Sequence, residues 1–246
     1  MPEGPSIFII KQTIRPLLKG QVIKEAFGNA KIDMQLLTGQ KVRDVKTWGK
    51  HLLICFKKDL TVRIHFLMFG SYSMDEQTKQ ERSVRLCLVT PGNKFFFYTC
   101  AVKLITENLD DVYDWEADLL NKGWNAAKAR KKLKGIPGTM VCDAILDQGI
   151  FAGAGNIFKN EVLYRIKLHP ETRIGKIPPR KLTELVDEMH NYSYDFLRWK
   201  KKFVLKKHWL AHTKRTCKRC DLQLVKKYSG KTARRTFFCT NCQVKY

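Results

Sequence analysis

Four cysteines near the C-terminal end of the chain form two Cys-x-x-Cys pairs with eighteen residues between them: Cys217, Cys220, Cys239 and Cys242. Each pair can chelate a metal ion from a tight turn, and four thiolates suit tetrahedral Zn²⁺. The spacing therefore predicts a small ribbon around one structural Zn²⁺ ion, with no open coordination position. Redox chemistry and free thiols are the weaker alternatives for these four residues.

Residues 226–236, between the two pairs, are rich in lysine and arginine. If this segment folds as a hairpin, its tip carries a dense positive charge. It is then either a finger that contacts phosphate groups or a solvated, charged turn, and we favour the finger.

The chain is strongly basic: 46 Lys and Arg against 23 Asp and Glu in 246 residues give a formal net charge of +23. Such a charge suits binding to a polyanion, and nucleic acid is the simplest one. Ribosomal and chromatin proteins are similarly basic, so charge alone does not indicate an enzyme. The hydrophobic content of 44% is too high for a disordered basic tail.

The sequence has no feature of a membrane or secreted protein. No apolar run approaches the ~20 residues of a membrane span, and the start lacks the pattern of a secretory signal. We expect an intracellular monomer with no membrane partner and no disulfides. The remaining cysteines lie in apolar surroundings and are expected to be small buried residues: Cys55, Cys87, Cys100 and Cys142.

Hydrophobic periodicity divides the chain into a β-rich part and a helical part. We expect a helix over 5–18, then a β-sandwich or barrel over 21–106. Residues 108–125 are acidic and are expected to connect two domains. Examples of the expected strands are 21–27, 41–48, 52–56, 61–67, 83–90 and 94–98, and the later helices are expected at 126–134, 140–148, 156–166 and 178–199.

These patterns predict an α+β fold, with an N-terminal helix and a β-sandwich followed by a helical domain and the zinc ribbon. The expected domain boundaries are 1–115, 126–210 and 211–246.

The chain begins Met1-Pro2-Glu3, and an initiator methionine before proline is usually removed. Pro2 would then have a free secondary amine, and an α-amino group titrates near ~8, so part of it is unprotonated at neutral pH. Attack of this amine on an aldehyde-like carbon gives an iminium, which is an electron sink. Glu3 could donate or accept the proton of that step. Alternatively, Pro2 merely spaces the start of the chain.

A glycine turn, residues 147–156, joins two of the expected helices and ends at Asn156. Free N–H groups at a helix N-terminus bind phosphate well, and Asn156 could add its side-chain amide. Taken alone, the pattern is weak, because glycine turns between packed helices are common.

Together, Pro2-Glu3, the Gly-x-Gly-Asn turn and the cysteine ribbon resemble the formamidopyrimidine-DNA glycosylase/endonuclease VIII family of base-excision repair enzymes. The resemblance covers essentially the whole chain, in the right order. Lys50, in Trp-Gly-Lys-His, is similar to the family's essential lysine. Residues 65–70 resemble the segment that pushes side chains into the duplex, and Arg234 stands at the position of the phosphate-gripping arginine of the zinc finger.

The resemblance implies a bifunctional enzyme with a helix-two-turn-helix domain, acting on damaged DNA. Pro2 would attack C1′ of the sugar of a flipped-out nucleotide, with Glu3 as proton donor. Successive β- and δ-eliminations would then cut the strand. The flanking phosphates would be held by Lys50, Asn156 and Arg234, with His65 as a weaker candidate.

Leu67, Met68 and Phe69 are expected to fill the space that the flipped nucleotide leaves. Phe69 and Met68 are better candidates for insertion than Leu67. Alternatively, alternate members of this run belong to the core of a strand.

The sequence favours oxidised pyrimidines over oxidised purines as substrates. Gly149 stands where the purine enzymes have a lysine, and residues 200–216 are too short and basic for an obvious lesion-capping loop. Ser6 replaces a glutamate of many members, which puts rate or substrate range in doubt. Two rivals stay open: an oxidised-purine glycosylase, and a non-catalytic zinc-ribbon protein that binds damaged DNA. Only catalysis needs the set of Pro2, Glu3 and Lys50.

Overall fold

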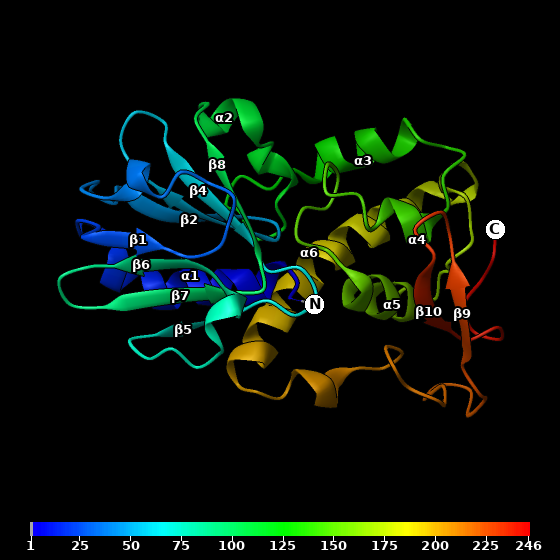
Figure 1. The fold of residues 1–246 in the computed structure, drawn as a ribbon. Coiled ribbons are helices and arrows are strands. Elements are labelled where there is room, and N and C mark those ends of the chain that lie inside the picture. Colours follow the sequence, from blue (N-terminus) through cyan, green and yellow to red (C-terminus); the bar gives the residue numbers. More distant parts are fainter. Residues whose placement is uncertain (1) are drawn as a thin grey trace. The chain divides into compact units, whose positions relative to one another are not determined.

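The computed structural model describes residues 2–246, which form an N-terminal unit that ends at Asp114 and a C-terminal unit from Trp115 to Tyr246 (Figure 1). Each unit has a hydrophobic core of its own. The α+β class is confirmed, because strands dominate the first unit and helices the second.

The N-terminal unit begins with helix α1, Gly4–Leu18, as the spacing of its apolar residues predicts. Pro5 lies in the first turn, where a missing N–H costs nothing. The helix buries Ile7, Ile14 and Leu18, and Gly20, with a φ of 84°, follows its end.

Two antiparallel four-stranded sheets form the sandwich, in the orders β2-β3-β4-β8 and β1-β6-β7-β5. The first sheet contains β2 (Asp44–Trp48), β3 (His51–Cys55), β4 (Thr61–His65) and β8 (Ala101–Ile105), and the second contains β1 (Glu25–Phe27), β5 (Ser71–Met74), β6 (Val84–Val89) and β7 (Lys94–Tyr98). Short helices lie between or after them: η1 (Gln35–Leu37), η2 (Glu81–Ser83) and α2 (Leu109–Val112).

The core of the sandwich follows from alternation along the strands. Phe95 and Phe97 of β7 join the main core, whereas Phe96 and Tyr98 pack in a smaller cluster on the other face. Side chains of α1 complete the main core, and helix α1 packs against β2 and β3. The expected N-terminal helix with a β-sandwich is therefore confirmed.

The C-terminal unit contains α3 (Ala126–Lys134), α4 (Val141–Ala144), α5 (Asn156–Arg165) and the long α6 (Pro179–Lys201), with the strands β9 (Val225–Ser229) and β10 (Arg234–Phe238). Short 3₁₀ helices are η3 (Trp115–Ala117), η4 (Ile174–Lys176) and η5 (Leu205–His208). Phe158 of α5 packs edge-on to Tyr192 of α6 at 5.1 Å between ring centroids.

The cysteine hairpin shares this unit with the helices, because β10 packs against α5 (Figure 1). Tyr164 of α5 joins the buried cluster of Cys217, Phe237 and Cys239. The separation of 126–210 from 211–246 into two domains stays a prediction.

Some expected elements differ in extent from the observed ones. The helix expected over 140–148 is only Val141–Ala144, because Asp147 accepts a hydrogen bond from the N–H of Gly149 and closes a turn instead. The strands β5 and β8 are two further strands within the β-rich range expected over 21–106. The acidic segment 108–125 holds α2 and η3 as well as connecting chain.

Candidate functional site

Glu3 stands at the N-cap position of α1 with extended backbone, directly after Pro2. Its backbone carbonyl accepts a hydrogen bond of 2.8 Å from the N–H of Ser6, which ties the start of the chain to the first helical turn. Glu3 is only 2% exposed, an unusual degree of burial for a carboxylate side chain. The fold therefore fixes a buried carboxyl group beside Pro2.

Lys50 lies in the two-residue turn between β2 and β3, where Trp48 pairs with His51. Gly49 has a φ of 51°, a left-handed conformation that glycine adopts readily. The residue before this turn is bonded to the last residue of the N-terminal unit, because Trp48 Nε1 donates to the carbonyl of Asp114 at 2.9 Å.

Lys50 and His65 lie close together, although they come from different turns and strands. His65, the last residue of β4, pairs with His51, and the two imidazole rings meet edge to face at 5.4 Å. Burial and the charges of Arg63, His65 and Lys50 lower the pKa of His51 to about 3. Burial and the charges of Lys50 and Arg63 also lower the pKa of His65. Both rings are therefore neutral at pH 7 and add no positive charge to this region.

Leu67, Met68 and Phe69 form the tip of a turn that follows β4. The three residues are 45%, 52% and 74% exposed. The turn is anchored at its base, where Phe66 is buried and the N–H of Gly70 donates to its carbonyl at 2.8 Å. A Cβ atom at Gly70 would collide with the backbone of Phe66, so only glycine closes this turn. None of the three apolar residues is a core residue of a strand.

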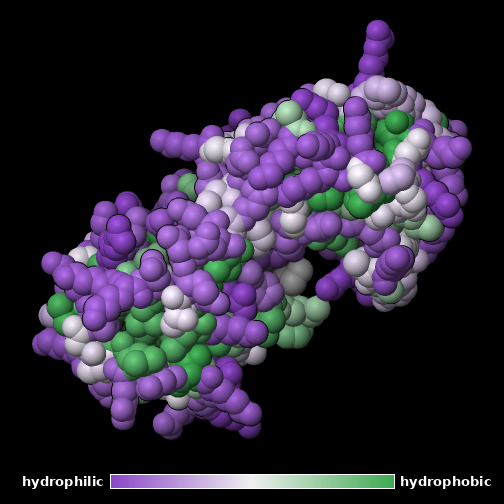
Figure 2. Space-filling view, turned by 90° about the horizontal axis from the view of Figure 1, so that it is seen from above, coloured by the Kyte–Doolittle hydropathy of each residue, from purple (hydrophilic) through white to green (hydrophobic). Residues whose placement is uncertain are grey.

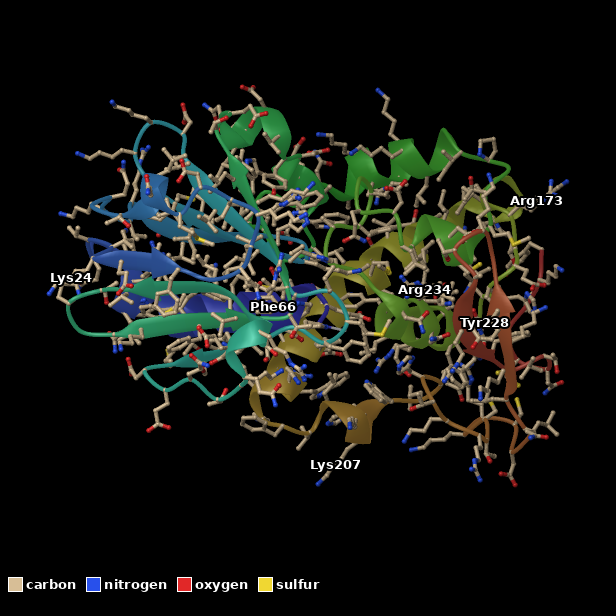
Figure 3. All side chains as sticks on the ribbon, viewed as in Figure 1. Lys24, Phe66, Arg173, Lys207, Tyr228 and Arg234 are labelled. Carbon is tan, nitrogen blue, oxygen red and sulfur yellow. The ribbon has the colours of Figure 1, made fainter. Side chains whose placement is uncertain are left out.

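Asn156 begins helix α5, and its side-chain amide donates to the carbonyl of Arg235 at 3.0 Å. The helix N-terminus and the start of β10 are thus joined directly. The glycine turn before the helix is organised by Gln148, which accepts from the N–H of Gly153 and donates to the carbonyl of Ala154. Arg234, the first residue of β10, has an exposed side chain (Figure 3).

Three consecutive polar residues of α5, Lys159, Asn160 and Glu161, are almost completely buried and bind the hairpin and residues 210–212. Lys159 Nζ donates to Thr236 Oγ1 at 2.8 Å, and Asn160 Oδ1 accepts from the N–H of Phe237 at 2.9 Å. The carboxylate of Glu161 accepts three backbone N–H groups, those of residues 210–212.

The tip of the same hairpin is held by Asp143 of α4. Its carboxylate accepts hydrogen bonds from the backbone N–H groups of Lys231 and Thr232, at 2.9 Å and 3.2 Å. Gly230 packs so closely on this carboxylate that an added Cβ atom would collide with it. Sequence reasoning missed these anchors, since a polar residue on a helix gives no sign of a partner some 90 positions away. The one signal in the sequence was the run of three polar residues, Lys159-Asn160-Glu161, between the apolar residues Phe158 and Val162.

The four ribbon cysteines converge, with all Sγ atoms within 4.8 Å of one another. Cys217 Sγ and Cys242 Sγ are 3.7 Å apart, close to the ~3.8 Å expected between two thiolates on one tetrahedral Zn²⁺ ion. The donor set and its geometry therefore fit the predicted zinc ion. The scattered cysteines are buried, as expected.

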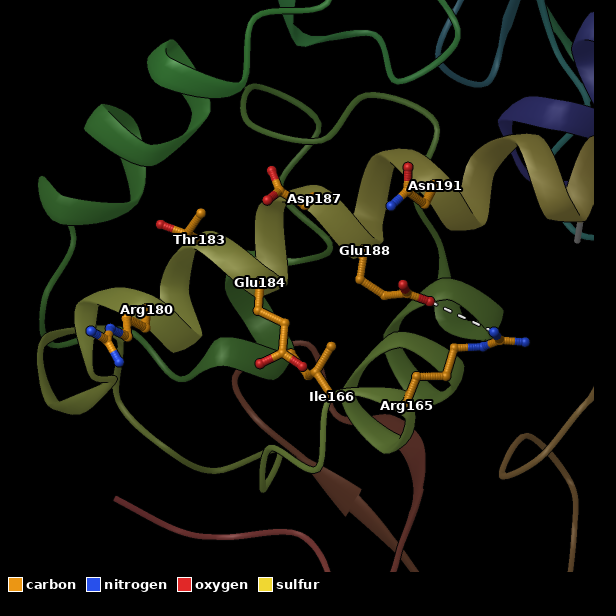
Figure 4. A pocket seen from close by; sticks show the side chains of 8 residues that line it. All are labelled: Arg165, Ile166, Arg180, Thr183, Glu184, Asp187, Glu188 and Asn191. Atoms are coloured by element: carbon orange, nitrogen blue, oxygen red, sulfur yellow. Dashed lines mark ion pairs between the residues drawn. The ribbon is translucent and has the colours of Figure 1, made fainter.

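A pocket of about 420 Å³ lies between the end of α5 and one side of α6 (Figure 4). Its lining mixes acidic and basic groups, including the ion pair of Arg165 and Glu188 at 3.7 Å. None of the predicted site residues lines it, and its opposed charges do not suit an anionic ligand.

Hydrophilic side chains cover most of the molecular face in Figure 2, with smaller hydrophobic patches between them. None of the helices within residues 2–246 has both the length and the hydrophobicity of a membrane span.

The sandwich with its N-terminal helix, the glycine turn before α5 and the four-cysteine hairpin together define the class of protein: one with the fold of a DNA glycosylase. Residues 1–101 match the formamidopyrimidine-DNA glycosylase N-terminal domain, and residues 117–197 match the formamidopyrimidine-DNA glycosylase H2TH domain. The chain belongs to the formamidopyrimidine-DNA glycosylase/endonuclease VIII family.

Relatives from both branches of the family are similar to the chain. Endonuclease 8-like 3 of Bos taurus is 28% identical over 217 residues, which cover 85% of this chain and 36% of the relative. Formamidopyrimidine-DNA glycosylase of Lactobacillus helveticus is 26% identical over 284 residues and is covered completely, as is this chain. The chain thus spans about a third of the endonuclease 8-like 3 proteins that it matches.

Among solved structures, formamidopyrimidine-DNA glycosylase of Lactococcus lactis bound to DNA containing an AP site has the same fold. The TM-score is 0.87 at 20% identity, with 99% of this chain and 100% of the other covered.

Proposed function

We propose that the protein is a DNA glycosylase with AP lyase activity, which removes oxidised bases from DNA in base-excision repair. The observation that most directly supports this activity is the buried carboxyl group of Glu3 beside Pro2 at the start of α1. Membership of the family and the net charge of +23 support the same activity.

The nucleophile is the amine of Pro2 after removal of Met1. Its lone pair forms a bond to C1′ of the damaged nucleotide while the bond from C1′ to the base breaks, and the base leaves with a proton. Loss of the amine proton and protonation of the ring oxygen by Glu3 open the sugar and give an iminium.

The iminium acidifies the C2′ proton. Its removal expels the 3′ phosphate, and a second elimination expels the 5′ phosphate, before hydrolysis releases Pro2. Lys50, Asn156 and Arg234 hold the phosphates on either side of the lesion, and His65 is a weaker candidate for the same role. His65 would do so as a neutral hydrogen-bond donor, because its pKa is lowered by burial and Lys50.

The exposed apolar side chains of Leu67, Met68 and Phe69 occupy the space of the flipped nucleotide. Their turn is anchored at Phe66 and Gly70, so it can present them without a loss of core packing.

One Zn²⁺ ion would be held by Cys217, Cys220, Cys239 and Cys242. It has a structural role, because four thiolates complete its coordination shell. The protein acts as a monomer inside the cell.

Oxidised pyrimidines are the favoured substrates. Gly149 has no side chain that could replace the lysine of the purine enzymes, and residues 200–216 contain the short helix η5 rather than a long loop. Oxidised purines are the second candidate, because this chain also matches formamidopyrimidine-DNA glycosylase over its full length.

Borohydride trapping tests the chemistry. Protein whose N-terminal Pro2 has been verified by mass spectrometry is incubated with duplexes bearing thymine glycol, 8-oxoguanine or an abasic site, and then reduced. We expect a covalent adduct, formed best with thymine glycol among the damaged bases. The control is the same chain with a retained N-terminal extension, in which the Pro2 nitrogen is an amide and cannot form the iminium.

An adduct that persists with the blocked N-terminus would assign the nucleophile to another amine. No adduct on any of the three duplexes, with Pro2 free and binding intact, would favour a non-catalytic protein that binds damaged DNA.

A further inference from the structure

Phe203 is the most exposed large hydrophobic residue among those that the structure describes, at 94%. It follows α6 directly, and no catalytic or zinc-binding role described above uses it. Exposing a whole phenyl ring to water is unfavourable, and most phenylalanine side chains of this protein are buried.

The backbone holds the ring outward through a defined helix-ending motif. The N–H of Val204 donates to the carbonyl of Trp199 at 3.0 Å, and the N–H of Phe203 donates to that of Lys200 at 3.1 Å. Phe203 then has a φ of 58°, in the left-handed region where this motif usually has glycine. Phe203 therefore has a strained, left-handed backbone conformation, and its ring is exposed in that conformation.

The segment on both sides of the ring is rigidly attached. Trp199 and Leu205 are buried in the core of the C-terminal unit, and Val204 packs against it. The Trp199 ring also stacks on His208 at 4.2 Å between ring centroids. The exposed ring thus stands on a fixed base and needs no large ordering on binding.

Positive charge flanks Phe203 along the chain. Five exposed lysines lie within four residues of it: Lys200, Lys201, Lys202, Lys206 and Lys207. Lys207 projects from this segment in Figure 3. No Asp or Glu occurs from residue 196 to residue 220, so no neighbouring carboxylate in the sequence neutralises these lysines.

We infer that Phe203 and its flanking lysines form a binding site for single-stranded DNA, in which the phenyl ring stacks on an unpaired nucleobase. An aromatic ring within a cluster of cations matches a base face joined to phosphates. A paired base inside a duplex has both faces covered, so the site is selective for unpaired bases. This inference rests on the proposed function, because it assumes that DNA is the partner.

The test compares binding to a short single-stranded oligonucleotide with binding to a fully paired duplex of the same length, at one salt concentration. Phe203→Gly is expected to lose about tenfold in affinity for the single strand, the typical loss for one stacked base. It should unfold at the same temperature as the parent or higher, because glycine suits the left-handed backbone. Phe203→Trp should retain the affinity, and Phe203→Leu, which keeps an apolar side chain without a π face, should lose it.

Tyr194→Ala is the matched control, since Tyr194 is an aromatic residue of α6 that is 48% exposed and lies beside Asp195 rather than among lysines. Its single-strand affinity should match the parent. A 2-aminopurine base in the oligonucleotide should be quenched by the parent and less by Phe203→Gly.

Unchanged single-strand affinity in Phe203→Gly or Phe203→Leu would overturn the stacking site. An equal loss on single strand and duplex would also overturn it, because Phe203 would then be a general DNA contact. A parent that binds neither DNA would instead contradict the proposed function.

Discussion

Lys159, Asn160 and Glu161 show how single residues hold the candidate site in place. Burying three polar side chains in a row is costly unless each finds hydrogen-bond partners. Here the partners are backbone and hydroxyl groups of the hairpin and of residues 210–212. These contacts also place Arg234 beside α5, since Lys159 Nζ donates to the backbone carbonyls of Arg234 and Arg235.

His51 makes acid stability testable at a single residue. Its pKa is lowered to about 3 by burial and by Arg63, His65 and Lys50, against ~6.5 for an unfolded chain. Below pH ~6.5 the unfolded state binds the proton and the folded state does not, so the free energy of unfolding falls as pH falls toward 3. The contribution is at most about 1.4 kcal/mol per pH unit.

Urea unfolding of the parent and of His51→Gln at pH 7 and pH 4.5 checks this expectation. Glutamine does not titrate, so the variant should lose less stability than the parent between the two pH values. Equal losses would contradict the lowered pKa of His51.

Phe69 is expected to serve the activity and not the stability. The side chain is 74% exposed, so Phe69→Ala should change the free energy of unfolding by less than about 0.5 kcal/mol. Cleavage of a damaged duplex should fall severalfold, because the vacated space is filled less well. Single-turnover kinetics and thermal unfolding measure the two effects, and unchanged kinetics would remove Phe69 from the proposed wedge.

At the scale of elements, the hairpin of β9 and β10 is held by hydrogen bonds at its tip and along β10. Asp143 binds the backbone at its tip, while Lys159 and Asn160 bind along β10. A hairpin of two strands is marginally stable alone, so these anchors are needed to give the hairpin a fixed orientation.

Gly230→Ala should destabilise the C-terminal unit by about 1–3 kcal/mol, because alanine is strained at a φ of 73° and its Cβ atom collides with Asp143. In the double variant with Asp143→Ala the collision is absent. The stability losses of the two single variants should therefore add up to more than the stability loss of the double variant. Chemical unfolding of the four proteins measures this coupling, and strict additivity would show that the contact is not made.

Most elements could be predicted from the sequence, because local periodicity sets them. The helices α1 and α3 and the strand β7 lie where their apolar spacing places them. The strand β5 is only four residues long, so the alternation of Tyr72 and Met74 is too short to mark a strand by itself. Its place in the sheet depends on pairing with β7. The helix α4 is shorter than the expected 140–148, because the side chain of Asp147 competes for backbone groups that a longer helix would use.

On the scale of the whole molecule, the net charge of +23 predicts DNA binding that weakens steeply with salt. Counterions released from the DNA cause this dependence, and each lysine or arginine on a phosphate adds about one unit to the slope of log affinity against log salt.

Arg234→Ala should therefore bind an abasic-site duplex more weakly and with a salt slope smaller by about one. The side chain is exposed, so zinc content and unfolding temperature should stay those of the parent. Titrations at several salt concentrations, with zinc measured in the same samples, provide the check. A variant that binds like the parent would show that the hairpin does not grip phosphate.

The sequence by itself determined the fold class, the family and the candidate chemical groups, because these depend on short motifs. Pro2-Glu3 and the two cysteine pairs each indicate a chemical role from a few neighbouring residues. Only the tertiary structure decided which groups are fixed, buried or exposed. In the structure Glu3 and Lys159 are buried, whereas Phe69 and Phe203 are exposed. Asp143 binds a turn some 90 residues later in the chain. Such contacts come from packing between distant segments, which no local pattern encodes.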